Sequence, residues 1–262
     1  MPVQPEKQEL MNFAELLADS GRKVFLDAIN EYPQVEIKSD NSLVTNIDIA
    51  IETRLREMIE NEYPDHGIIG EEFGNKNIDQ NYVWLLDPID GTHAFVAGIP
   101  VYGTLIGLAR KGLPFLGIVD HPATHERWKC VKGDKTRKNG KEVRTRECDK
   151  LESAFLTNSN PDFFNITESK QFQKLRRTVQ ITQYGGSCYA YAVLASGRTD
   201  LAIDSEMSPV DIFACAAIIE GAGGKITDWE GSPITLSWYG QVLASGDQSL
   251  HDKALNLINY DV

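Results

Sequence analysis

The spacing of apolar residues changes along this chain, and each spacing predicts a different kind of structure. Up to about Ile29 the apolar residues recur every three to four positions, which is typical of an amphipathic helix. A second helix is predicted to begin near Thr45, because Thr45 and Asp48 have the spacing of an N-terminal capping box, and to end near Tyr63. Short β-prone runs bounded by turn residues follow, at 67–70, 82–86, 101–109, 115–119 and 127–131.

A polar stretch at 132–150 leads into a different pattern, in which strands alternate with helices. Strands are predicted at 154–157 and 201–203, and helices at 170–177 and 188–196. A further helix is predicted to start at Pro209 and to stop at Gly221. With 262 residues, the chain is long enough to bury a full core. We therefore expect an α+β half over 1–150 and an α/β half over 151–262.

Composition and charge limit the class of protein. Apolar residues make up 42% of the chain and charged residues 24%, which is typical of a soluble globular protein. The longest nearly apolar run, at 212–219, is far shorter than the roughly 20 residues of a membrane-spanning helix. The first residues, with Glu6, Lys7 and Glu9, lack the apolar region of a signal peptide. A net charge of -12 disfavours binding to nucleic acid or to an anionic membrane.

The cysteines indicate a reducing compartment. They are widely spaced and include no Cys-x-x-Cys pair, at Cys130, Cys148, Cys188 and Cys215. This spacing disfavours a zinc site or a disulfide framework, so we expect a cytoplasmic protein. Because lysines and arginines form no conspicuous block, bound metal cations are a candidate source of the local positive charge that a small anionic substrate needs.

The segment that carries the most chemical information is D-P-I-D-G-T at 87–92, which directly follows a buried strand. Asp87 and Asp90 place two carboxylates at the end of that strand. Gly91 lets the backbone approach a ligand closely. If a helix starts after Asp90, the amides of Gly91 and Thr92 point at its N-terminal end and can bind an anion. The segment therefore predicts cation ligands and phosphate donors within one turn of each other.

Further carboxylates have positions from which they can join this site. Glu71 follows another apolar run, and Asp211 lies just inside the helix that starts at Pro209. The three aspartates each have a simpler explanation: Asp90 can cap a helix, Asp87 can be solvated, and the helix dipole favours an acidic residue at Asp211. Like charges about 4 Å apart repel by roughly 4 kcal/mol at an effective dielectric constant of about 20, so a real cluster needs protons or cations. Oxygen ligands favour Mg²⁺ or Mn²⁺ over Zn²⁺.

These residues resemble the inositol monophosphatase superfamily, through G-E-E at 70–72, D-P-I-D-G-T at 87–92 and the late Asp211 before a helix of small residues. The resemblance covers nearly the whole chain. It implies a layered αβαβα sandwich of the sugar-phosphatase type, with the site in the cleft between the two halves. It also implies a Mg²⁺-dependent hydrolase of phosphate monoesters, Mn²⁺ as a possible substitute, inhibition by lithium, and a homodimer acting on a small phosphorylated metabolite.

The resemblance implies a role for each site residue. One Mg²⁺ would be bound by Glu71, Asp87 and the Ile89 carbonyl, and a second by Asp87, Asp90 and Asp211. A third, weaker ion would bind at Glu71. Glu71 and Thr92 would orient the attacking water, while Asp90 and the amides of Gly91 and Thr92 would hold the phosphate. Asp48 would support the metal ligands without binding the metal itself. Val210 stands where the superfamily usually has Trp, which leaves the shape of the substrate pocket open.

The leaving group is less clearly indicated. The segments L-I-G-L at 105–108, H-E-R-W at 125–128 and C-Y-A-Y at 188–191 are most similar to the histidinol-phosphate phosphatase branch, although a salt-bridged strand and a packed helix start would also explain them. Ser187, Asp204 and Asp211 are expected to face the leaving group. That branch usually has an acidic residue at the position of Ser187 and Glu at that of Asp204. A cationic leaving group would therefore lose one carboxylate partner at Ser187.

The histidines are not needed for this mechanism. His93 is expected at the rim of the site, and His121 and His125 are expected to be exposed on a connection. We expect the reaction to be hydrolysis of histidinol phosphate to histidinol and phosphate. The alternatives are an inositol-1-monophosphatase, another sugar-phosphate or nucleotide phosphatase, or a non-catalytic metal-binding protein that kept the fold.

Overall fold

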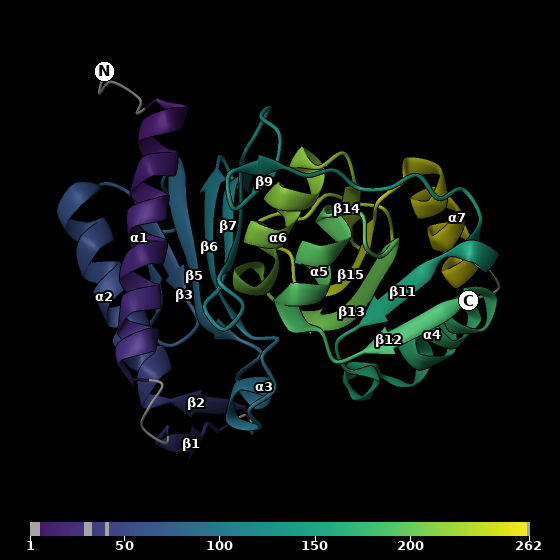
Figure 1. The fold of residues 1–262 in the computed structure, drawn as a ribbon, viewed down its shortest axis with the longest axis horizontal. Helices are drawn as coiled ribbons and strands as arrows, with labels where there is room; N and C mark the ends of the chain where they lie inside the picture. The colour runs from purple at the N-terminus through teal and green to yellow at the C-terminus, as the bar shows by residue number, and fades with distance from the viewer. Residues whose placement is uncertain (1–5, 29–32, 40–41, 261–262) are drawn as a thin grey trace.

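The fold of this computed structural model is a stack of alternating layers of helix and sheet (Figure 1). The structure describes residues 6–28, 33–39 and 42–260. From one end, the order is a helix pair, an eight-stranded sheet, a second helix pair, a five-stranded sheet and a third helix pair. The expected αβαβα sandwich is therefore confirmed. Among the described residues, no helix is both long and apolar enough to cross a membrane.

The outer helix pair and the eight-stranded sheet come from the first part of the chain. The helices are α1 (Lys7–Ala28) and α2 (Asn46–Glu62); the predicted end of the first helix at Ile29 lies outside the described residues. The strand order is β10-β9-β8-β7-β6-β5-β3-β4. The strands are β3 (Gly67–Gly70), β4 (Gly74–Lys76), β5 (Tyr82–Asp90), β6 (Gly103–Arg110), β7 (Leu113–His121), β8 (Glu126–Val131), β9 (Arg137–Lys138) and β10 (Lys141–Glu142).

Two small elements lie beside this sheet and near the site. The hairpin of β1 (Val35–Ile37) and β2 (Leu43–Thr45) leads into α2, and the five-residue helix α3 (Thr92–Val96) follows β5. The predicted capping box is present at the start of α2, where the Thr45 side chain accepts from the backbone of Asp48 and the Asp48 side chain accepts from the Thr45 backbone. This box explains why α2 begins where it does.

The second sheet has the order β12-β11-β13-β15-β14 and comes from the last part of the chain. Its strands are β11 (Phe155–Asn158), β12 (Ile181–Tyr184), β13 (Leu201–Met207), β14 (Lys225–Thr227) and β15 (Gly240–Ser245). The helices are α4 (Ile166–Thr178), α5 (Ser187–Ala195), α6 (Pro209–Gly221) and α7 (Gln248–Asn259), with two 3-10 turns at Leu151–Ser153 and Pro161–Phe163. Figure 1 shows α5 and α6 between the two sheets and α4 and α7 on the outer face.

Helix α6 joins the two sheets. It is apolar on all sides, as expected of a helix buried between two layers. A Cβ at Gly117 of β7 would lie 2.3 Å from the carbonyl oxygen of Ala214, so glycine is required for α6 to approach the first sheet this closely. This packing holds the first turn of α6, which contains Asp211, against the end of β5.

Several elements were not predicted from the sequence. These are the strands β1, β2, β4, β12, β14 and β15 and the helix α7. Most of the missed strands have only three or four residues, which is too short for an alternating pattern to stand out. Strand β5 also extends further than expected, from Tyr82 to Asp90, and so includes most of the 87–92 segment.

Candidate active site

Three aspartates from two distant parts of the chain converge. Asp87 and Asp90 come from the end of β5 and Asp211 from the first turn of α6. One carboxylate oxygen from each lies within 4.8 Å of the others. All three residues line a cavity of about 620 Å³, together with Glu71 and Thr92.

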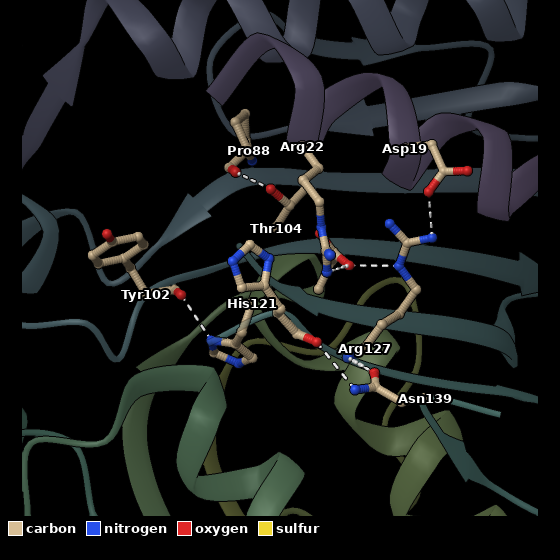
Figure 2. A network of polar contacts seen from close by, with 10 residues as sticks. Asp19, Arg22, Pro88, Tyr102, Thr104, His121, Arg127 and Asn139 are labelled. Atoms are coloured by element: carbon tan, nitrogen blue, oxygen red, sulfur yellow. Dashed lines mark hydrogen bonds and ion pairs between the residues drawn. The ribbon is translucent and has the colours of Figure 1, made fainter. Parts of the chain in front are cut away.

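A bulge in β5 explains how Asp87 and Asp90 face the same side. Residues three apart in a regular strand point to opposite faces. The pairing of β5 with β6 shifts in register between Asp87 and Asp90. At this bulge the Thr104 hydroxyl, from β6, donates a 2.8 Å hydrogen bond to the Pro88 carbonyl (Figure 2). Thr104 is 3% exposed, so this bond is shielded from water and holds the bulge in place.

The electrostatics of the cluster fit a bound cation. Burial, followed by the charges of Glu71 and Asp90, raises the pKa of Asp87 far above its usual range. Asp87 Oδ1 is buried without a hydrogen-bond partner among the described residues. Burial also raises the pKa of Asp90 to about 6 and that of Asp211 above its usual range. A divalent cation bound by these oxygens would remove the repulsion and supply the missing partner.

Asp90 and Asp211 each use one oxygen to fix a helix. Asp90 Oδ2 accepts a 2.6 Å hydrogen bond from the Cys188 amide at the start of α5. Asp211 Oδ2 accepts a 2.6 Å hydrogen bond from the Ser208 amide in the capping box of α6. Capping, the simpler explanation given for Asp90, therefore holds for Asp90 at α5, and Asp211 also caps a helix, α6. Capping does not compete with a metal role, because a carboxylate has a second oxygen.

Glu71 is positioned by a carboxylate beneath it. Glu52 of α2 accepts hydrogen bonds from the amides of Glu72, at 2.8 Å, and Phe73, at 3.2 Å. A Cβ at Gly70 would lie 2.0 Å from Glu52 Oε1, so glycine is required there. The pKa of Glu71 is raised, because the effect of burial exceeds that of its hydrogen bond with Asp87, which lowers the pKa. This support explains the G-E-E pattern at 70–72 in physical terms.

Lys38 is a site neighbour to which no sequence pattern pointed. Its Nζ lies 3.7 Å from Glu71 Oε1 and 2.7 Å from Glu72 Oε2. It follows β1, one of the short strands that were not predicted. Lys38 brings a positive charge to the acidic cluster, and only the tertiary structure reveals this contact.

The turn at Gly91 has a left-handed backbone conformation that favours glycine. Gly91 has φ 82, and a Cβ there would lie 2.7 Å from Ser187 Oγ. Helix α3 starts at the next residue, Thr92. The Thr92 hydroxyl donates a 3.0 Å hydrogen bond to the Ile89 carbonyl, whose second lone pair remains available to a cation.

Ser187 and Asp204, expected at the leaving group, and Asp48, expected to support the metal ligands, have different environments. Ser187 lines the cavity. Asp204 does not: it is 2% exposed, and its carboxylate accepts hydrogen bonds from Asn158, Ser159 and Tyr191. Asp48 is fully buried away from the cavity lining, and burial raises its pKa to about 6.

The histidines differ from expectation in one case. His93 is exposed and lines the cavity, and His125 is exposed in the turn between β7 and β8. The expected exposure of His121 is wrong: it is the last residue of β7 and fully buried, because the strand continues past 119. His121 Nδ1 lies 2.7 Å from the Tyr102 carbonyl (Figure 2). Burial lowers its pKa to about 4.

The segments similar to the histidinol-phosphate phosphatase branch contact each other. The Tyr189 hydroxyl donates a 2.7 Å hydrogen bond to Glu126, and the Trp128 indole donates one of the same length to Ser196. These contacts hold α5 against β8 and favour the structural explanation for those side chains. Val210 is buried in the core and is not among the residues that line the cavity.

Comparison with known proteins assigns the family. Residues 6–260 match the model of the inositol monophosphatase family. The chain is 40% identical to the bifunctional phosphatase IMPL2, chloroplastic, of Arabidopsis thaliana, covering 99% of this chain and 78% of that protein. It is 32% identical to a histidinol-phosphatase of Chlorobaculum parvum, covering 87% of this chain and 89% of that protein.

Solved structures show the same relationship. An inositol monophosphatase from Zymomonas mobilis superposes with a TM-score of 0.88 at 35% identity, over 97% of this chain and 99% of that one. Family, fold and acidic site therefore agree. The chain belongs to the inositol monophosphatase family and is a Mg²⁺-dependent phosphoric monoester hydrolase that acts on small phosphorylated substrates.

Proposed function

We propose that this enzyme hydrolyses histidinol phosphate to histidinol and phosphate. The observation that carries the proposal is the charge of the cavity. Among the described residues, neither lysine nor arginine lines it, whereas Glu206 joins the metal-site carboxylates in its wall. A sugar bisphosphate or a phosphoadenosine nucleotide would place a second anionic group in this cavity without a cationic partner. A protonated amine or imidazole avoids that cost.

Inositol 1-phosphate is the second candidate. Uncharged polar side chains in the same wall, Ser159, Asn160 and Ser205, can form hydrogen bonds with the hydroxyls of a neutral polyol. The 35% identity with the Zymomonas mobilis inositol monophosphatase also supports it.

The site residues keep the roles that the resemblance implied. We propose that Glu71, Asp87 and the Ile89 carbonyl hold one Mg²⁺, and that Asp87, Asp90 and Asp211 hold a second. A third ion binds more weakly beside Glu71, and Mn²⁺ can replace Mg²⁺. When bound, these ions would stabilise the negative charge of the phosphoryl group in the transition state and make water a stronger nucleophile.

The protein groups orient the reactants around these ions. The Glu71 carboxylate and the Thr92 hydroxyl orient the attacking water. Asp90 and the amides of Gly91 and Thr92 hold the phosphate. Ser187 and Asp211 face the leaving group. Asp204 does not contact the leaving group directly. It acts only through Ser159, which lines the cavity and donates hydrogen bonds to the Asp204 carboxylate. Asp48 supports the turn before α2.

The larger organisation is also a proposal. We propose two halves, 1–150 and 151–262, because the eight-stranded sheet lies in the first range and the five-stranded sheet in the second. We propose a homodimer, as the family resemblance implies. A reducing compartment such as the cytoplasm fits the four free cysteines.

The test is a side-by-side measurement of phosphate release from histidinol phosphate and from inositol 1-phosphate, with Mg²⁺ and with chelator. We expect a higher kcat/KM for histidinol phosphate and no turnover in chelator. A large preference for inositol 1-phosphate would replace the proposed substrate by the second candidate.

A further inference from the structure

One acidic side chain in the cavity wall is separate from the aspartate cluster. Glu206 lies near the end of β13 and lines the cavity together with its two neighbours, Ser205 and Met207. In a regular strand, consecutive side chains point to opposite faces, so three in a row do not line one cavity. The strand is therefore irregular at this point.

The irregularity is a bulge that re-aims Glu206. Asp204 pairs with Val242 and Met207 with Gly240, so Ser205 and Glu206 lie opposite the single residue Gln241. Glu206 itself has φ 58, in the left-handed region that favours glycine. Bulges next to active sites commonly turn a side chain toward a ligand, and such a strained residue persists where the surrounding structure enforces it.

The Glu206 carboxylate is available to a ligand. Among the described residues it has no hydrogen bond or ion pair, in contrast to Asp204 two positions earlier, whose carboxylate is saturated by protein donors. Burial, and then the charges of Glu206 and Asp211, raise the pKa of the Tyr239 phenol. Glu206 and Asp211 both line the cavity, so Glu206 lies close to the expected position of the leaving group.

We propose that Glu206 binds a cationic group, such as a protonated amine, on the leaving group of the substrate, and so sets a preference for cationic over neutral phosphate esters. This inference rests on the proposed function. The Glu206 carboxylate would also take the place of the acidic residue that the histidinol-phosphate phosphatase branch usually has at the position of Ser187. Glu206 is exposed, so water and salt screen its charge. We therefore expect its hydrogen bond to the cationic group to lie at the weak end of the range for charged hydrogen bonds, which corresponds to about a tenfold change in KM.

The test compares KM for histidinol phosphate and inositol 1-phosphate in two variants. Glu206→Gln removes the charge and keeps the shape, and Glu206→Gly removes the side chain and relieves the backbone conformation. In both, the ratio of KM for histidinol phosphate to KM for inositol 1-phosphate should rise about tenfold. The matched control is Glu147→Gln, which removes an equal charge from an exposed residue outside the cavity and should leave the ratio unchanged.

The outcomes separate the inference from the proposed function. If the wild type prefers histidinol phosphate and neither Glu206 variant changes the ratio, the inference fails and the proposed function stands. An equal rise of both KM values also overturns the inference, because it shows a general effect on the site. If the wild type hydrolyses inositol 1-phosphate and not histidinol phosphate, the proposed function fails and the inference fails with it.

Discussion

The Cys188 amide donates a 2.6 Å hydrogen bond to Asp90 Oδ2, and this bond joins the start of α5 to the end of β5. On the neighbouring residues, Ser187 packs against Gly91 so closely that a Cβ on Gly91 would lie 2.7 Å from Ser187 Oγ. The turn proposed to bind phosphate and Ser187, which is proposed to face the leaving group, are therefore held against each other. The site depends on the packing of the two sheets through α5 and α6.

Asp87 is the carboxylate shared by both proposed ions, so Asp87→Asn should remove turnover while the fold remains. We expect kcat/KM to fall by at least about a thousandfold, since metal ions supply several kcal/mol to such reactions. Mg²⁺ should raise the melting temperature of the wild type and not that of the variant, because binding to the native state stabilises it. Circular dichroism checks the fold. Turnover by the wild type without added metal in chelator would contradict this mechanism.

Thr104 is predicted to position the site without contacting substrate. Thr104→Val leaves the Pro88 carbonyl without its hydrogen-bond donor, at a cost of about 1 to 3 kcal/mol, and loosens the bulge between Asp87 and Asp90. We expect the Mg²⁺ concentration for half-maximal activity to rise several-fold.

The matched control for this change is Thr199→Val. The Thr199 hydroxyl is buried without a hydrogen-bond partner among the described residues, so its loss should be neutral or stabilising. Equal Mg²⁺ requirements in the Thr104 and Thr199 variants would show that the hydroxyl bond to Pro88 does not position the metal ligands.

Asp204→Asn should affect stability more than specificity. The carboxylate accepts hydrogen bonds from Asn158, Ser159 and Tyr191, and an amide group cannot accept all of them. Each bond lost from a buried charged group costs roughly 1.5 to 3 kcal/mol, so we expect a melting temperature lower by several degrees. The preference between histidinol phosphate and inositol 1-phosphate should stay close to that of the wild type. A large change in preference with unchanged stability would place Asp204 in contact with the leaving group.

A buried histidine predicts a loss of stability in mild acid. His251 is fully buried, and burial lowers its pKa from 6.5 to about 4. Above pH 6.5 it is neutral in both states and contributes no pH dependence. Between pH 6.5 and 4 the unfolded chain binds the proton and the folded protein does not, so stability falls as the pH falls.

Urea unfolding at several pH values checks this prediction. His251→Gln should unfold with a smaller loss of stability between pH 6.5 and 4.5 than the wild type. His125→Gln is the control, because His125 is exposed. The buried aspartates oppose this trend, since a raised pKa in the folded state favours folding at lower pH, so only the difference between variants isolates His251. Identical pH profiles for His251→Gln and wild type would refute the assignment.

Much of the site could be predicted because its parts are local. Asp87, Asp90 and Gly91 lie within one short segment, and their types alone indicate a cation and a phosphate. Lys38, Thr104 and Glu206 could not be predicted, because each acts through a contact or a bulge that depends on strand register. The register of β13 against β15, which turns Glu206 into the cavity, is set by tertiary packing and not by local sequence.

The fold shows the same division. Long helices and the buried central strands have clear periodicity and were predicted. The edge strands β1, β4 and β14 have three residues each, and their pairing depends on neighbours far along the chain. His121 was misjudged for a related reason: the continuation of β7 to that residue is fixed by its pairing with β8.

The central claim is that Asp87, Asp90 and Asp211 bind divalent metal ions, and anomalous diffraction from crystals grown with Mn²⁺ tests it most directly. The account predicts the strongest anomalous peak among these three carboxylates in the wild type, and the loss of that peak in Asp87→Asn. No anomalous peak among these carboxylates in wild-type crystals at saturating Mn²⁺ would contradict it.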